Sequence, residues 1–145
     1  MEWRNHETPI DLVRGPWEAK GGYSRAVRVG EHLYVAGTTA MKDGKLVGPG
    51  DVIAQTRQTM STIVNALHEA GASIGDVVRY RVYLTNIDDS AKVVPLLGEY
   101  FGAVRPAGTL VAVAALISPD MLIEIEVDAI CGTASNPDDE PHHHA

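Results

Sequence analysis

Residues 121–131 read MLIEIEVDAIC, and from Ile123 to Ala129 they alternate strictly between apolar and acidic side chains. A β-strand turns successive side chains to opposite faces of its sheet. One face of this segment is therefore apolar, and the other carries three carboxylates, those of Glu124, Glu126 and Asp128. The pattern predicts a long strand over residues 121–131 with one buried face and one acidic face.

Outward from this strand, the chain from residue 23 alternates between strand and helix patterns. The β-rich runs SRAVRV and LYVAGTTA flank Gly30-Glu31-His32, a short loop typical of a hairpin. A helix with one apolar stripe opens at Asp51 and ends before Gly71, and a second runs over 90–101. Further strands are predicted over 77–84 and 109–116. The resulting order is β-β-α-β-α-β-β.

The strand over 77–84 also has two different faces. Alternation groups one set, Val78, Tyr80, Val82 and Leu84, against a second set, Val77, Arg79, Arg81 and Tyr83. The second set contains two arginines. These cations are candidates for cross-strand pairing with the acidic face of residues 121–131.

These elements predict an α+β fold, a mixed sheet of five to six strands with two helices on one face. Two helices cannot cover both faces of such a sheet, and the last strands carry too many aliphatic residues for the second face to meet only solvent. We therefore expect a homo-oligomer. Residues 1–22 have no clear period and are expected to form an irregular arm, residues 23–131 a single domain, and residues 132–145 a disordered tail.

Composition excludes several function classes. The 19 acids and 12 bases give a net charge of −7, without the basic run that nucleic-acid binding requires. No apolar stretch approaches the roughly 18–20 residues of a membrane span. The start of the chain, MEWRNHETPIDLVRGPW, lacks the apolar centre of a signal peptide, so we expect a cytoplasmic protein.

The sequence predicts no metal and no cofactor. His6, His32 and His68 have no spacing that would place two of them on one ion, and there is no phosphate-binding glycine loop. The only cysteine, Cys131, cannot form an intramolecular disulfide and is expected to be a packed thiol.

The acidic face of residues 121–131 allows two interpretations. In the first, the three carboxylates form a solvated face or pair with Arg79 and Arg81. In the second, Glu124 is a general acid and base in a partly dry interface, where its pKa would rise toward neutrality.

Five separated blocks resemble the Rid/YjgF family of reactive intermediate deaminases, also called the L-PSP family. The blocks are GYSRAVRVGEHLYVAGTTA, DVIAQTRQTM, RYRVYLTNIDD, EYFGAVRPA and LISPDMLIEIEVDAI. The resemblance implies a fold similar to that of trimeric chorismate mutases, with clefts between the subunits of a homotrimer. It also implies hydrolysis of small enamines or imines to a 2-oxo acid and ammonia. Tyr23 and Glu124 match the family's site tyrosine and glutamate.

The chain departs from this family at residues 105–113, RPAGTLVAV. Deaminating members carry an arginine after Pro-Ala, which binds the substrate carboxylate, whereas this chain has Gly108. We expect open space there, filled by a larger or differently anchored imine or enamine. The expected substrate-binding residues are Arg25, as the replacement anion anchor, and Gly108, Thr109 and Leu110. The alternative that Arg25 is a solvent-facing strand residue stays open.

Two further functions are compatible with the resemblance. One is a non-catalytic homotrimer that binds a metabolite or a partner protein through the same clefts, which the apolar run TLVAVAAL favours. The other is the ribonuclease activity of some relatives, which the acidic balance disfavours.

Overall fold

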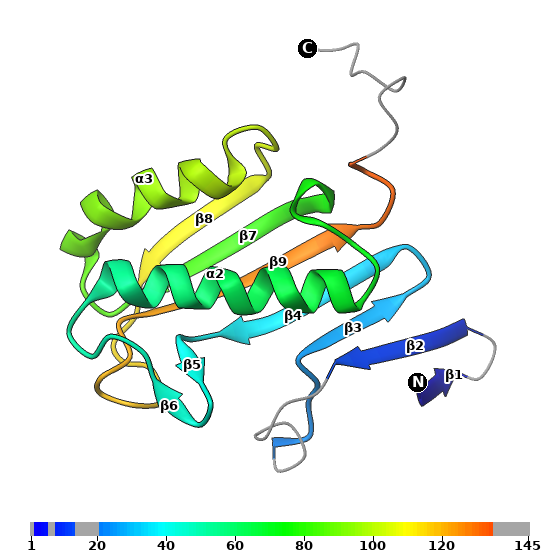
Figure 1. Ribbon diagram of the computed structural model, residues 1–145, viewed down its shortest axis with the longest axis horizontal. Coiled ribbons are helices and arrows are strands. Elements are labelled where there is room, and N and C mark those ends of the chain that lie inside the picture. Colours follow the sequence, from blue (N-terminus) through cyan, green and yellow to red (C-terminus); the bar gives the residue numbers. More distant parts are fainter. Residues whose placement is uncertain (1, 6–7, 14–20, 135–145) are drawn as a thin grey trace.

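The computed structural model describes residues 2–5, 8–13 and 21–134, which form a mixed β-sheet with helices on one face (Figure 1). The helical elements are α2 (Val52–Glu69), η1 (Ile74–Asp76), η2 (Ile87–Asp89) and α3 (Ser90–Phe101). The strands are β1 (Glu2–Asn5), β2 (Thr8–Val13), β3 (Ala26–Val29), β4 (His32–Thr38), β5 (Met41–Lys42), β6 (Lys45–Leu46), β7 (Val77–Leu84), β8 (Ala107–Ala112) and β9 (Ile123–Ile130).

The main sheet has seven strands in the order β1-β2-β3-β4-β9-β7-β8. Strands β7 and β8 are parallel, and every other neighbouring pair is antiparallel. The alternating strand β9 therefore lies inside the sheet, between β4 and β7. The separate hairpin β5–β6 turns at Asp43-Gly44, where both residues have positive φ as a type I′ turn requires.

The α+β fold class is confirmed, and the order of elements from residue 23 onward is confirmed except for the additional hairpin β5–β6. The main sheet has seven strands, whereas five to six were predicted. The prediction of an irregular arm is wrong for residues 2–5 and 8–13, because β1 and β2 pair with each other and extend the sheet beyond β3. The penultimate strand is also shorter than predicted and begins earlier, at Ala107. Strand β8 does not pair with β9 but lies on the far side of β7. Of the predicted tail over residues 132–145, residues 132–134 are described as turn and bend, and residues 135–145 lie outside the described residues.

Helix α2 has the boundaries that its flanking residues predict. Asp51 is the N-cap, and its Oδ1 accepts a hydrogen bond of 3.0 Å from the Ala54 amide. Gly71 follows the helix with a φ of 84°, a left-handed conformation that glycine adopts without a Cβ penalty. The apolar stripe of α2 packs on the sheet with Met60, Ile63 and Leu67 fully buried.

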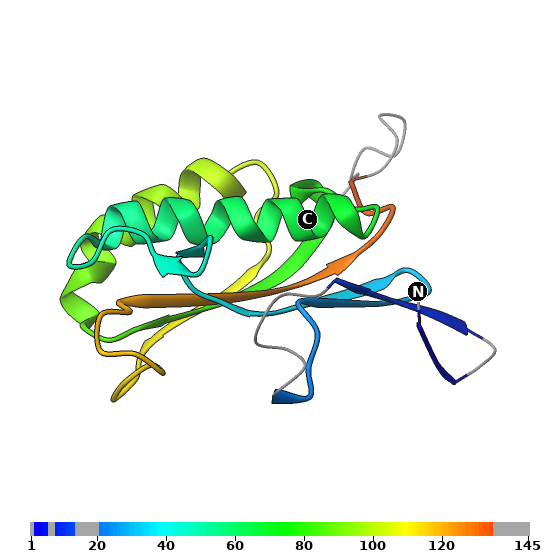
Figure 2. The ribbon, with the colours of Figure 1, turned by 60° about the horizontal axis from the view of Figure 1, so that its bottom comes forward.

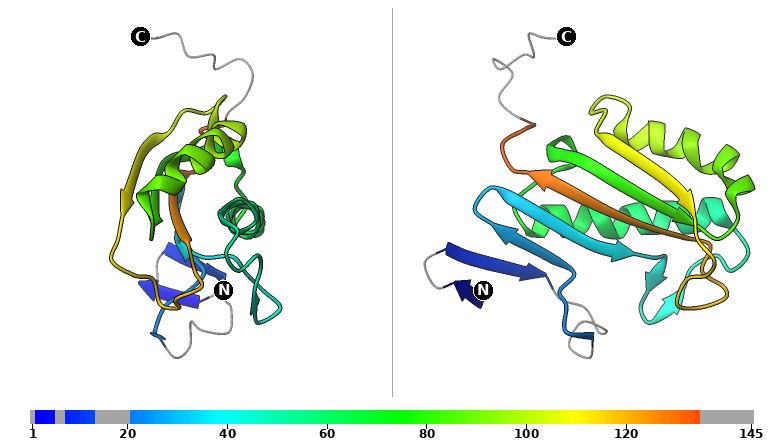
Figure 3. Two further views of the ribbon diagram at one scale, coloured as in Figure 1. Left: turned by 90° about the vertical axis from the view of Figure 1, so that its left-hand side faces the viewer. Right: turned by 180° about the vertical axis from the view of Figure 1, so that it is seen from behind.

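Helices α2 and α3 lie on the same face of the sheet (Figure 2). The opposite face carries no helix of the described chain, and it is seen directly when the molecule is viewed from behind (Figure 3). The core forms between the helices and the apolar face of β9, whose residues Ile123, Ile125 and Val127 are completely buried. We refer to the other surface of the sheet as the bare face.

A bulge changes the predicted faces of β7. Val77 pairs with Ala129 and Arg79 pairs with the adjacent Asp128, so that Val78 is the extra residue. Because of this bulge, Val77 joins the buried core instead of sharing the bare face with Arg79. The prediction for Val77 is therefore wrong, since strict alternation holds only where the ladder is regular.

Candidate functional site

Two of the three carboxylates of β9 are paired with side chains of β7 on the bare face. Arg81 Nη1 lies 3.7 Å from Glu126 Oε1 and 3.4 Å from Asp128 Oδ2. The Tyr83 hydroxyl donates a hydrogen bond to Glu126 Oε1, and this bond, together with partial burial, raises the pKa of the Tyr83 phenol. The cross-strand pairing predicted for the acidic face thus applies to Glu126 and Asp128, with Arg81 as the cation.

Glu124 differs from its two neighbours. It is half-buried on the bare face, and the described residues offer its carboxylate neither a hydrogen bond nor an ion pair. Burial raises the pKa of Glu124, the negative charge of Glu126 raises it further, and the positive charge of Arg25 opposes both effects. This carboxyl therefore binds a proton more tightly than an exposed glutamate does.

The carboxylate of Glu124 lies over Gly37 of the adjacent strand β4. A Cβ added at position 37 would lie 2.9 Å from the Glu124 carboxyl carbon and closer still to one carboxylate oxygen. Any other residue at position 37 would therefore displace this carboxylate. The β4–β9 register is irregular between Val35 and Thr38, which places Gly37 at a bulge beside Glu124.

Arg25 approaches Gly37 from the other side. Its Nη2 donates a hydrogen bond of 2.6 Å to the Gly37 carbonyl oxygen, while the Arg25 carbonyl accepts one from the Ala36 amide. The Nε of Arg25 is buried and has no hydrogen-bond partner in the described part of the chain. Arg25 is thus a half-buried cation beside Glu124 and not a fully solvent-facing strand residue.

The other predicted catalytic residue, Tyr23, precedes β3 and is 45% exposed. Its ring lies against Gly21, where an added Cβ would be 2.8 Å from a ring carbon. Among residues 21–134, no hydrogen bond joins Tyr23 to Glu124.

The predicted substrate-binding residues of β8 divide between the two faces. In the parallel β7–β8 register, Gly108 pairs with Tyr80 and Leu110 with Val82, which places both on the helix-covered face. Thr109 pairs with Arg81 and lies on the bare face with Glu124. Within one chain, therefore, Gly108 and Leu110 do not share a face with Glu124 and Arg25.

The expected open space at Gly108 is contradicted by the position of Tyr80. An added Cβ at position 108 would lie 2.6 Å from Tyr80 Cζ and 2.7 Å from its hydroxyl oxygen. The Tyr80 ring is held by stacking on Phe101 of α3, with 4.9 Å between the ring centroids. Glycine is needed here because an aromatic side chain occupies the space above it.

An open groove of about 500 Å³ lies farther out, between α3 and the edge strand β8. Its walls include Val94, Gly98, Arg105, Gly108 and Leu110. The groove opens on the helix-covered side of the sheet and does not include Glu124 or Arg25.

Sequence reasoning missed Gly37, although a signal was present. A glycine inside a strand pattern indicates a bulge or a close approach of another group, and here it indicates both. No comparable signal identified Tyr80, because its proximity to Gly108 depends on the parallel pairing of two strands.

Among residues 21–134, no three His, Cys, Asp or Glu side chains lie close enough together to hold a metal ion. Within the same part of the chain, neither α2 nor α3 combines the length and the apolar character needed to cross a bilayer.

Comparison with known proteins agrees with this architecture. Residues 15–131 match the family model described as Endoribonuclease L-PSP. A protein of Streptomyces coelicolor is 40% identical over 121 residues, covering 83% of this chain and 90% of the relative. A RutC family protein of Pyrococcus abyssi is 41% identical over 111 residues, covering 75% and 86%.

A crystal structure from Mycobacterium tuberculosis, of a member of the YjgF/YER057c/UK114 family, superposes with a TM-score of 0.76. It is 43% identical and covers 84% of this chain and 99% of that one. The family match spans most of the sequence, and the superposition covers most of the chain. The chain therefore belongs to the YjgF/Rid (L-PSP) family.

Proposed function

We propose that this protein hydrolyses a small enamine or imine, with Glu124 as the general acid and base. The observation that carries the proposal is the isolation of Glu124, which is half-buried, has a raised pKa and is unpaired among the described residues. Its two neighbours on β9 are engaged by Arg81 and Tyr83. A carboxyl that only forms a structural ion pair needs neither partial burial nor a raised pKa.

The reaction adds water across a C=N bond. The water oxygen bonds to the imine carbon while a proton is transferred to nitrogen, and the C–N bond of the resulting carbinolamine then breaks to give a ketone and ammonia. An enamine first takes a proton on carbon and becomes the imine. Each step moves a proton, and a carboxyl with a raised pKa can both donate and accept one nearer neutral pH. The chemistry requires no redox cofactor.

Ammonia release from imino acids generated in situ by an amino-acid oxidase tests this proposal. Glu124→Gln keeps the shape of the side chain but cannot transfer the proton, and we expect a rate loss of about 10²-fold or more. Asp128→Asn, on the same strand and face but paired with Arg81, is the matched control and should retain most of the activity. Equal rates for the wild type and Glu124→Gln would exclude catalysis by Glu124.

We also propose that the bare face is the packing surface of a homotrimer, with the Glu124 site in a cleft between subunits. Exposed aromatic and aliphatic side chains on this face, Tyr34 and Val111, support packing against another subunit. A cytoplasmic location likewise stays a prediction.

A non-catalytic binding protein is the second candidate, because apolar side chains also gather near the end of β8. Val111 is 41% exposed and Ile117 is 88% exposed. Calorimetric titration that detected tight metabolite binding without ammonia release would favour this candidate.

Ribonuclease activity, which the description of the family model names, is not the function that we propose. The chain has a net charge of −7, and the site lies beside the carboxylates of Glu124 and Glu126. These charges would repel a phosphate backbone.

A further inference from the structure

We propose that Arg25 is the anion-binding residue of the Glu124 site and holds a carboxylate of the substrate in place of the arginine that this chain lacks at position 108. This inference rests on the proposed function for the identity of the reacting group. Arg25, which directly precedes β3, would then determine which substrates bind.

The first argument is that Arg25 is already held in position. Its Nη2 donates to the Gly37 carbonyl oxygen at 2.6 Å, and the neighbouring backbone is fixed by the bond from the Ala36 amide to the Arg25 carbonyl. A guanidinium that is anchored at one nitrogen loses little additional side-chain freedom when the other nitrogens bind a ligand. Arg25 is therefore preorganised as a donor.

The second argument is the unsatisfied donor of the same side chain. Arg25 Nε is buried, yet the described residues provide no acceptor for its N–H group. A buried donor without a partner is unfavourable, and more so when the group is charged. An acceptor supplied by a bound anion would satisfy this donor.

The third argument is the separation of Arg25 from Glu124. Arg25 Nη2 binds the Gly37 carbonyl oxygen and the Glu124 carboxylate lies over the same glycine, so the two groups are close. They do not form an ion pair within 4.0 Å in the described structure, because Arg25 is directed to the Gly37 carbonyl. Because Gly37 lacks a Cβ, the Glu124 carboxylate can approach the same backbone segment that anchors Arg25. A carboxylate on Arg25 would therefore place an adjacent C=N group toward Glu124.

The fourth argument is that position 108 cannot bind the substrate carboxylate beside Glu124. Tyr80 occupies the space above it, and the position faces the helix-covered side of the sheet. Among the described residues of the bare face, Arg81 is already engaged by Glu126 and Asp128. Arg25 is thus the cation of this face that combines an unsatisfied donor with proximity to Glu124.

The test is equilibrium binding of 2-oxobutanoate, with its methyl ester as a neutral probe of nearly the same size. Titration calorimetry on the full chain would compare the wild type with Arg25→Gln, Arg25→Lys and Arg79→Gln. Arg79 is an exposed arginine on the same face, so its variant removes an equal charge without changing the proposed site. Thermal unfolding of each variant establishes that it is folded.

We expect the wild type to bind the oxo acid about tenfold or more tightly than the ester, as one charge-assisted hydrogen bond implies. Arg25→Gln should lose this preference. Arg25→Lys should retain part of it, because it keeps the charge but lacks the Nε donor and the planar fork. Arg79→Gln should behave as the wild type.

Two outcomes overturn the inference. One is equal affinity of the wild type for the oxo acid and the ester, and the other is an unchanged preference in a folded Arg25→Gln variant. Ammonia release measured in parallel separates this inference from the proposed function. If binding depends on Arg25 but no hydrolysis is detected, Arg25 is an anion-binding residue and the proposed hydrolase activity is excluded. If hydrolysis depends on Glu124 but the protein does not prefer the oxo acid to the ester, the proposed activity is supported and the role of Arg25 is excluded.

Discussion

Gly108 and Tyr80 are register partners in the parallel pair β7–β8, and the phenol ring of Tyr80 occupies the place that a side chain at position 108 would need. Position 108, where the sequence lacks the arginine that binds the substrate carboxylate in deaminating members, is therefore filled by the Tyr80 ring in the structure of one chain. Because of this relationship, we expect substitutions at position 108 to lower stability.

Gly108→Ala is expected to lower the free energy of unfolding by about 1–3 kcal/mol, as overpacking does. In a Tyr80→Ala background the cost should fall, because the obstructing ring is gone, and a double-mutant cycle by urea denaturation measures the coupling. Gly98→Ala is the matched control, since an added Cβ in this helix meets nothing within 4 Å and should stabilise by about 0.5–1 kcal/mol. An identical cost in both backgrounds would contradict the packing described here.

Glu124→Gln should make the protein more stable at neutral pH. The pKa of Glu124 is raised in the folded state above its ordinary value of 4.5, so its protonated form contributes stability that is present below that value. This contribution is lost as the pH rises through the folded-state pKa. The stability advantage of Glu124→Gln should therefore be smallest in acid and grow as the pH increases.

Urea denaturation at a series of pH values measures this difference. Glu126→Gln is the comparison variant and should be destabilising at neutral pH, because Glu126 accepts the Tyr83 hydrogen bond and lies beside Arg81. An advantage of Glu124→Gln that shrank with rising pH would show that the carboxyl is not desolvated.

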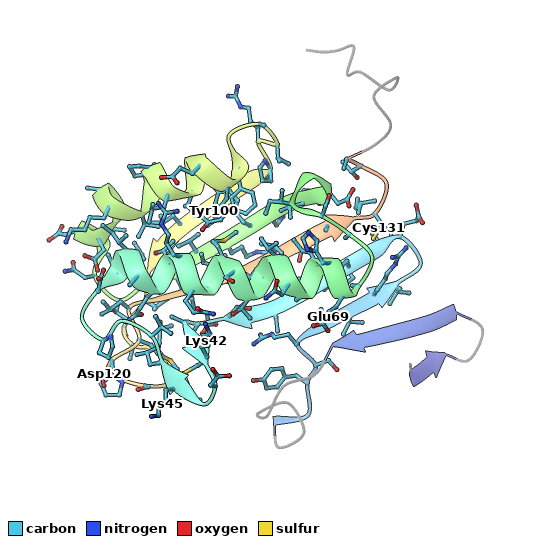
Figure 4. All side chains as sticks on the ribbon, viewed as in Figure 1. Lys42, Lys45, Glu69, Tyr100, Asp120 and Cys131 are labelled. Carbon is cyan, nitrogen blue, oxygen red and sulfur yellow. The ribbon has the colours of Figure 1, made fainter. Side chains whose placement is uncertain are left out.

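Gln55→Leu should destabilise the site as well as the fold. The buried amide of Gln55 donates to the carbonyls of Gly48 and Asp120 and accepts from the Leu122 amide, each within 3.1 Å. Figure 4 shows Asp120 at the end of the molecule that also holds Lys45, opposite Cys131. We call these three hydrogen bonds the Gln55 clamp. Because Leu122 lies two residues before Glu124, the clamp fixes the start of β9.

Removing the amide leaves buried polar groups unpaired, and we expect a loss of about 1–3 kcal/mol together with faster hydrogen exchange at the Leu122 amide. Gln58→Leu, one turn along α2 and partly exposed, should change stability by no more than about 0.5 kcal/mol. Similar effects of the two variants would show that the clamp has no special role.

Sedimentation equilibrium should give a mass three times the 15.5 kDa of one chain. A charge placed on the bare face, as in Tyr34→Glu or Val111→Glu, should shift the mass toward that of one chain, because each residue is at least 41% exposed there. Val94→Glu, 55% exposed on α3, is the control and should leave the mass unchanged. A wild-type protein that sediments as a monomer would exclude the trimer and any cleft between subunits.

The sequence by itself determined the local elements and the acidic strand. Alternation along residues 123–129 identified β9, and Asp51 and Gly71 bounded α2, because each depends on interactions within a few residues. The same periodicity placed Glu124 on one face with Glu126 and Asp128, and the family resemblance distinguished Glu124 from these two. Among the described residues, the two neighbours are paired and Glu124 is not.

Only the tertiary structure decided which side chains meet across strands. The placement of β8 beside β7, the Val78 bulge and the ring of Tyr80 over Gly108 all depend on pairing between segments that are distant in sequence. A one-residue change in such a ladder moves a side chain to the other face, and no local pattern records it. For the same reason, the convergence of Arg25 and Glu124 on the bare backbone of Gly37 became visible only once β4 was placed beside β9.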